Sequence, residues 1–337
     1  MSLRLGTRRS PLALAQSAVI ADWLRAGGHE VQVVPVTTLG DTSNAALTDI
    51  GGTGVFASAL RDALLAGQVD LAVHSLKDLP VAAQPGLLVA AVPAREDPRD
   101  VVVTRQGRTL GELPDGSVVG TGSPRRAAQL AALGLGLVVQ DVRGNVDTRI
   151  GYVAAGRLDG VVLARAGLAR LGRLAEVSQV LDPLQMLPAP GQGALAVECR
   201  ADDTAAAEAV APLDDADTRA CVTAERSLLQ ALEAGCTAPI GALAEVVEGE
   251  DGLELSLRGF AGTVDGTLAL RRSVLGPVDQ AEQLGRALAV MLLADGAGGI
   301  QPQLPSGSPP TPPPAHPPSQ PDRRQNSSAA TTTERAS

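Results

Sequence analysis

The sequence predicts an α/β fold, with two clamshell-like parallel-sheet domains followed by a small α+β domain. Segments typical of strands and helices alternate from residue 1 to about residue 200, which is the pattern of parallel sheets. Charged or proline-rich segments at 93–100 and 187–193 interrupt this alternation, as linkers between domains would. From about residue 214 the predicted order becomes helix, three strands, helix. With 337 residues, the chain is long enough for two or three domains, each with a core of its own.

The first domain is expected to combine residues 1–93 with 194–212. Strands are predicted at 4–7, 31–37, 69–73 and 87–92, with helices from Ser10 to Gly28 and over 54–66. Ser10 can cap the first helix, and Pro11 suits its first turn. If the apolar segment 194–198 returns to this sheet, the chain crosses twice between domains. Such a double crossing is typical of the hinge of a clamshell, periplasmic-binding-protein-like fold.

The second domain is expected over 99–188, with strands at 101–103, 117–121, 137–139 and 160–163. Helices are predicted from Ser123-Pro124 and after Asn145. Its opening resembles that of the first domain, because in both places a Gly-Thr pair precedes a Ser-Pro pair beside arginines. Two helix amino termini with added guanidinium charge would provide two anion sites that face one cleft. The alternative is that the Ser-Pro pairs only cap the two helices and that the arginines are solvated.

The third domain is expected over 214–297. Helices are predicted at 214–233 and 278–293, and strands at 240–248, 253–260 and 267–274. After Ile300 the chain is rich in Pro, Ser, Thr and Gln, so residues 301–337 are expected to be a disordered tail.

Composition argues against several functions. A net charge of -9 and an aromatic content of 1% disfavour binding to nucleic acid, and the charge also disfavours an anionic membrane surface. No apolar run is long enough to span a membrane, and the first residues lack the apolar core of a signal peptide, so a cytoplasmic location is expected. The three histidines are too scattered for a metal cluster.

Cysteine usage indicates free thiols, since the chain has three cysteines and no CxxC pair. Cys199 ends an apolar strand and Cys221 lies in a helix, so both are interpreted as buried structural residues. Cys236 follows Gly235 on a loop after a helix, which makes it the better candidate for covalent chemistry.

Basic residues supply the distinctive chemistry. Lys77 is the only lysine, and with Asp78 it follows a predicted buried strand, at the sheet edge where ligands bind in α/β folds. Loop arginines after other strands favour a ligand with several carboxylates or phosphates; they are Arg8, Arg9, Arg125, Arg126, Arg143 and Arg149. A surface ion pair is the alternative for Arg149. Arg61, Arg170 and Arg286 lie in helical segments and are expected to be solvated.

Six segments, in this order, match one family. They are 7–14 (TRRSPLAL), 74–78 (HSLKD), 96–100 (EDPRD), 143–149 (RGNVDTR), 191–194 (GQGA) and 235–236 (GC). They resemble the porphobilinogen deaminases, also called hydroxymethylbilane synthases, over roughly residues 3–297. The resemblance implies a transferase of tetrapyrrole and haem biosynthesis. Such an enzyme joins four porphobilinogen molecules head to tail, releases ammonia each time and forms the linear tetrapyrrole hydroxymethylbilane.

The resemblance also implies a dipyrromethane cofactor bound by thioether to Cys236, and a monomeric enzyme. Asp78 matches the catalytic aspartate, which would stabilise positive charge near the pyrrole N–H groups. The other implied contacts are Lys77, Ser123, Arg125, Arg126 and Arg143 for the cofactor, and Arg8, Ser10, Phe56, Arg149 and Gln192 for the substrate. Ser123 is expected to act as a capping hydroxyl. Asp49 and Thr53 stand where many family members have lysine, so the binding role of that loop is open.

Two other hypotheses remain at this stage. A non-catalytic clamshell protein that binds a polycarboxylate or phosphate solute would explain the arginines, although it gives Cys236 no task. An aldolase-like enzyme would use Lys77 to form an imine with a carbonyl substrate. Borohydride trapping tests the second hypothesis, since the absence of an adduct on Lys77 would eliminate it.

Overall fold

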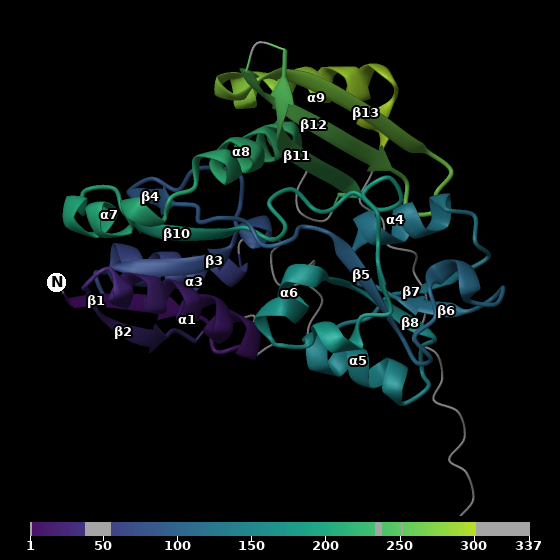
Figure 1. Cartoon of the computed structure of the whole chain (residues 1–337), viewed down its shortest axis with the longest axis horizontal. Helices are drawn as coiled ribbons and strands as arrows, with labels where there is room; N and C mark the ends of the chain where they lie inside the picture. The colour runs from purple at the N-terminus through teal and green to yellow at the C-terminus, as the bar shows by residue number, and fades with distance from the viewer. Residues whose placement is uncertain (1, 38–54, 233–237, 251, 301–337) are drawn as a thin grey trace, which may run out of the picture. The chain divides into compact units, whose positions relative to one another are not determined.

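The computed structural model describes residues 2–37, 55–232, 238–250 and 252–300, without the side chains of residues 55 and 56 (Figure 1). Within these ranges the strands form three sheets, two of them five-stranded and one three-stranded. Short 3-10 helices connect several elements; they are η1 (Leu76–Asp78), η2 (Leu110–Glu112), η3 (Leu174–Glu176), η4 (Ala211–Leu213), η5 (Val278–Gln280) and η6 (Ala297–Gly299). Cys236, Asp49, Thr53 and the tail 301–337 lie outside the described residues.

The first sheet has the strand order β2-β1-β3-β10-β4. Its strands are β1 (Ser2–Thr7), β2 (Glu30–Pro35), β3 (Leu71–Ser75), β4 (Leu87–Ala91) and β10 (Leu195–Arg200). Its helices are α1 (Pro11–Ala26), α3 (Val55–Leu65) and α7 (Thr204–Val210), of which α7 was not predicted. The core includes Leu3, Leu5 and Leu71.

Helix α1 forms where the sequence predicts it. The Ser10 side chain accepts a hydrogen bond from the Ala13 N–H, and Pro11 occupies the first turn. The buried residues Ile20, Ala21 and Leu24 recur at helical spacing, so one stripe of the helix packs on the sheet. The start of α1 is therefore fixed beside the end of β1.

The second sheet has the equivalent order β7-β6-β8-β5-β9. Its strands are β5 (Asp100–Thr104), β6 (Val118–Gly120), β7 (Val138–Gln140), β8 (Gly160–Ala164) and β9 (Gln179–Val180). Its helices are α4 (Pro124–Ala132), α5 (Val146–Ala154) and α6 (Arg165–Arg170). Asn145 caps α5 by accepting a hydrogen bond from the Thr148 N–H.

The α/β fold class is confirmed, and the sheets prove to be mixed. In each sheet three strands in sequence are parallel, whereas β10 in the first sheet and β5 in the second run antiparallel to both neighbours. Both strands enter from the other half of the molecule. Parallel neighbours are joined by a crossover within one sheet, and neither β10 nor β5 follows such a connection, so both can run antiparallel.

The expected return of the chain to the first sheet is confirmed, because β10 lies between β3 and β4. The two crossing segments touch at Gly193, which has φ +90°; a Cβ there would lie 2.3 Å from the Glu96 carbonyl oxygen. Only glycine fits this contact. The double crossing is therefore a close-packed junction.

The third sheet is antiparallel, with the order β11-β12-β13. Its strands are β11 (Ile240–Gly249), β12 (Gly252–Gly262) and β13 (Ala269–Pro277), and α8 (Ala216–Ala231) and α9 (Ala281–Ala294) cover one face (Figure 1). Against α4, buried Phe260 and Leu243 pack on Ala128 and Leu187. In the described part of the chain, no helix combines the length and apolar character that a membrane span requires.

Candidate active site

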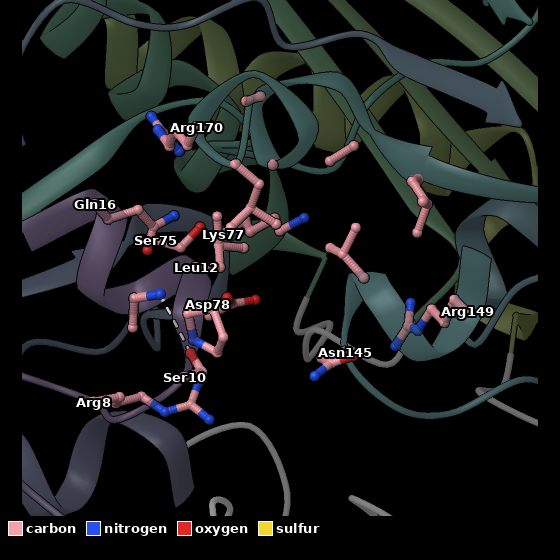
Figure 2. A pocket seen from close by; sticks show the side chains of 18 of the residues that line it. Arg8, Ser10, Leu12, Gln16, Ser75, Lys77, Asp78, Asn145, Arg149 and Arg170 are labelled. Carbon is pink, nitrogen blue, oxygen red and sulfur yellow. Dashed lines mark hydrogen bonds between the residues drawn. The ribbon is translucent and has the colours of Figure 1, made fainter. Parts of the chain in front are cut away.

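A cleft of about 690 Å³ lies between elements of the first and second sheets. The first half contributes the end of β3, η1 and the start of α1, and the second half contributes α5 and α6. Figure 2 shows Arg8, Ser10 and Asp78 on one side of this space, with Asn145 and Arg149 across from them. Six cationic side chains line the cleft, against the carboxylates of Asp78 and Asp147; the cations are Arg8, Lys77, Arg126, Arg143, Arg149 and Arg170.

Lys77 and Asp78 follow β3 directly, on the turn formed by η1. Leu76 is buried and anchors the turn, while the Asp78 side chain is exposed to the cleft. Lys77 is partly buried, and its Nζ donates a hydrogen bond to Gln192 Oε1 at 3.3 Å. Loss of water around the ammonium, aided by the charges of Arg126 and Arg125, lowers the pKa of Lys77 to about 8 against the opposing effect of Asp78 and Asp100.

Arg125 and Arg126 are buried at the start of α4, where both pair with Asp100 at 2.8 Å. Burial alone would raise the pKa of the Asp100 carboxyl, but the two guanidinium groups outweigh it and hold that pKa well below its usual range. Arg126 reaches the cleft, whereas Arg125 is not among the lining residues and donates to the Leu187 carbonyl oxygen. One carboxylate therefore balances two fixed cations beside the cleft.

The start of α5 supplies the second group of cations. Arg149 Nε donates to the Gly144 carbonyl oxygen at 2.9 Å, and Arg143 pairs with Asp141 at 3.1 Å. Burial, together with the nearby charges of Arg126 and Arg143, lowers the pKa of Arg149 to about 10. Arg149 remains a cation at neutral pH, so mutual repulsion among these arginines favours an anionic ligand.

Three predictions about arginines can be compared with the structure. Arg286 is exposed, as predicted. The prediction for Arg170 was wrong: it lines the cleft, and its NH2 donates to the Gly193 carbonyl oxygen at 2.6 Å. The prediction for Arg61 was also wrong, because it is buried and pairs with Glu198 at 2.8 Å. Arg61 lies on the buried side of α3 and Arg170 on the side of α6 that lines the cleft, which helical periodicity alone did not reveal.

The remaining predicted site residues fall into three groups. Ser123 occupies the N-cap position of α4, but its side chain makes no capping hydrogen bond, contrary to the predicted capping role. Gln192 is 1% exposed and does not line the cleft. Cys236 and the Phe56 side chain are outside the described residues.

Asp100 was missed as a site residue. It is the first residue of the buried strand β5, whose other residues are Val101, Val102, Val103 and Thr104. A charged residue at the start of an apolar strand is a sequence signal that could have identified it. Gln16 and Asn145 also line the cleft and were not predicted.

Cys199 and Cys221 are free and buried, as predicted. Burial raises the pKa of both thiols, to about 12 for Cys221. Neither is a reactive thiolate at neutral pH. Among the described residues, no group of His, Cys, Asp and Glu side chains is arranged to hold a metal ion.

The fold and cleft together define a class of protein with a cation-lined cleft between two α/β sheets. Within that class, residues 3–208 match the family model "Porphobilinogen deaminase, dipyromethane cofactor binding domain", and residues 219–294 match "Porphobilinogen deaminase, C-terminal domain". The chain belongs to the porphobilinogen deaminase family.

Individual relatives agree with the family models. The chain is 58% identical over 300 residues to a protein of Mycobacterium tuberculosis named porphobilinogen deaminase, covering 88% of this chain and 97% of that protein. It is 59% identical over 300 residues to a protein of the same name from Nocardia farcinica, covering 88% of this chain and 86% of that protein. A periplasmic sulfonate-binding protein from Methylobacillus flagellatus, of solved structure, is 16% identical with a TM-score of 0.36, over 69% of this chain and 68% of that one.

Proposed function

We propose that this chain joins four porphobilinogen molecules head to tail, with release of ammonia, to form hydroxymethylbilane. The observation that carries the proposal is the excess of cations in a cleft that two exposed carboxylates, Asp78 and Asp147, also line. Each pyrrole unit bears an acetate and a propionate, so a growing chain accumulates negative charge. The guanidinium forks of Arg8, Arg143 and Arg149 suit these carboxylates.

Asp78 is the proposed catalytic residue. Loss of ammonia from porphobilinogen leaves an electron-poor methylene pyrrole, and positive charge develops on the pyrrole rings as the next carbon–carbon bond forms. A carboxylate near the pyrrole N–H groups stabilises this charge and accepts a proton. Asp78 is exposed on a turn fixed by buried Leu76, which suits this role.

A dipyrromethane cofactor fits the residues present, because its carboxylates would meet the cations Lys77, Arg126 and Arg143 along the cleft. When bound, it supplies the primer to which substrate units are added. We propose attachment through Cys236. The inert, buried thiols of Cys199 and Cys221 support this assignment.

The proposed domains are 1–93 with 194–212, 99–188 and 214–297, and the proposed enzyme is a cytoplasmic monomer. Family membership supports an enzyme and not a non-catalytic solute-binding protein. Light scattering after size-exclusion chromatography tests the oligomeric state, and a mass twice that of the chain would contradict the monomer.

A turnover assay tests the activity. Purified protein is incubated with porphobilinogen, and released ammonia and hydroxymethylbilane are measured together. The proposal predicts four ammonia molecules per tetrapyrrole. Protein that retains its fold but consumes no porphobilinogen would refute it.

A further inference from the structure

Gln192 lies behind the cleft, in the second crossing between the two α/β sheets. Its side-chain amide makes three hydrogen bonds. Oε1 accepts from Lys77 Nζ at 3.3 Å, while Nε2 donates to the Pro98 carbonyl oxygen and to Asp100 Oδ1, each at 2.7 Å. The acceptors Pro98 and Asp100 belong to the first crossing and the strand after it. One buried amide therefore joins both crossings to the lysine of the cleft.

The chemistry of its neighbours fixes the orientation of this amide. An ammonium group can only donate, whereas a carbonyl oxygen and a carboxylate oxygen can only accept. A flipped amide would set its oxygen against two acceptors and its NH₂ against a cation. All three contacts require the same orientation of the amide. Glutamine offers both the acceptor and the donor that these partners need, whereas aspartate and glutamate lack the donor and an apolar residue lacks both.

The backbone of Gln192 is also fixed. Arg95 Nε donates to the Gln192 carbonyl oxygen at 2.7 Å, and buried Glu225 accepts from the Gly191 N–H at 2.6 Å. Arg95 and Glu225 are paired with each other at 2.6 Å. The amide is thus presented to Lys77 from a rigid support, which is what a precise site requires.

The charged groups that face Lys77 are Asp78, Asp100, Arg125 and Arg126. Three cations and two carboxylates share this region, and Asp100 is already held by both arginines. Loss of the acceptor at position 192 would leave the repulsion from Arg125 and Arg126 less balanced, which disfavours the protonated form of Lys77.

We propose that Gln192 is a positioning residue, which holds the Lys77 ammonium beside Asp78 and links it to the Asp100 carboxylate that orients Arg125 and Arg126. Gln192 thereby acts through other residues and does not itself bind substrate. Its effect on the reaction rests on the proposed function, whereas its effect on Lys77 does not.

The single lysine of the chain permits a direct test. Holoenzyme grown with ¹³C-labelled lysine gives one lysine side-chain NMR signal, whose titration reports the pKa of Lys77. Gln192→Met removes the acceptor, so the pKa should fall below about 8 by roughly 0.5 to 1. Gln192→Glu places a carboxylate at the same position and should raise that pKa above about 8. Gln179→Met is the control, because its amide bonds the Leu110 N–H instead.

An unchanged Lys77 pKa in the Gln192 variants that fold would overturn the proposal. If Gln192→Met does not fold, the proposal is tested by Gln192→Glu alone, in which the pKa of Lys77 should rise. In turnover at about pH 6.5, where Lys77 keeps its proton in both proteins, Gln192→Met should lower kcat about tenfold with little change in KM for porphobilinogen, and an unchanged kcat would overturn the positioning role. Wild-type protein without turnover would instead refute the proposed function and leave the NMR result standing.

Discussion

At the scale of single residues, Lys77 and Asp78 are neighbours with opposite charges and different surroundings. Asp78 is exposed to the cleft, while Lys77 is partly withdrawn from water beside two buried arginines. The loss of water and the charges of these arginines disfavour the ammonium form of Lys77. The turn therefore presents a carboxylate for chemistry and a cation whose charge depends on pH.

Replacing Asp78 by Asn should lower kcat at least about 100-fold, because the amide can neither stabilise positive charge nor accept a proton. Steady-state turnover of porphobilinogen checks this. Asp147→Asn is the matched control, since Asp147 also lines the cleft but pairs with Arg173. Near-normal turnover in Asp78→Asn would show that its assigned role is wrong.

The pH dependence of substrate binding follows from Lys77. Its pKa is lowered from 10.5 to about 8, so the ammonium is present below pH 8 and is lost as pH rises through that value. Because the loss of this cation from the cleft weakens the attraction for the carboxylates of incoming porphobilinogen, KM for porphobilinogen should rise several-fold between about pH 7.5 and 9. Lys77→Arg stays charged and should abolish this rise. A wild-type KM that is constant over this range would contradict the prediction.

Several residues that local sequence motifs singled out lie together in the structure. Arg8, Ser10, Lys77, Asp78, Arg126, Arg143 and Arg149 all line the cleft. The pairing of Asp100 could not be found in this way, because Arg126, one of the two arginines that pair with it, lies 26 residues further along the chain. Only the packing of α4 beside β5 brings these charges together.

At the scale of elements, helical periodicity and capping residues located α1, α4 and α5. The two-residue strand β9 and the short helix α7 were not predicted, since neither is long enough to show a period. The direction of β10 and β5 could not be predicted from the local sequence pattern, because it depends on where the chain re-enters a sheet.

The junction of the two crossings can be tested at Gly193. Alanine there combines an unfavourable positive φ with a contact of 2.3 Å to the Glu96 carbonyl oxygen. Gly193→Ala should lower the free energy of unfolding by more than about 3 kcal/mol, measured by urea denaturation. Gly172→Ala has φ +69° but no atom within 4 Å, so it should cost only about 1 kcal/mol. Equal losses in both variants would show that the crossings are not closely packed.

At the scale of the whole molecule, the net charge of -9 contrasts with the cationic lining of the cleft. Local arginine clusters attract a polyanion that the overall charge would repel. The third sheet is connected to this arrangement through Glu225, which pairs with Arg95 and accepts a hydrogen bond from the Ala244 N–H of β11 at 2.9 Å. The segment that bears Cys236 therefore follows a helix that is anchored at the crossings.

The central claim is that this cleft works with a dipyrromethane attached to Cys236. Intact-mass spectrometry of the purified protein, followed by peptide mapping, tests it directly. The expected result is an excess mass equal to two linked pyrrole units on the peptide that contains Cys236, and no excess in Cys236→Ser. Protein at the bare mass of its sequence, or with the added mass on Cys199 or Cys221, would contradict the claim.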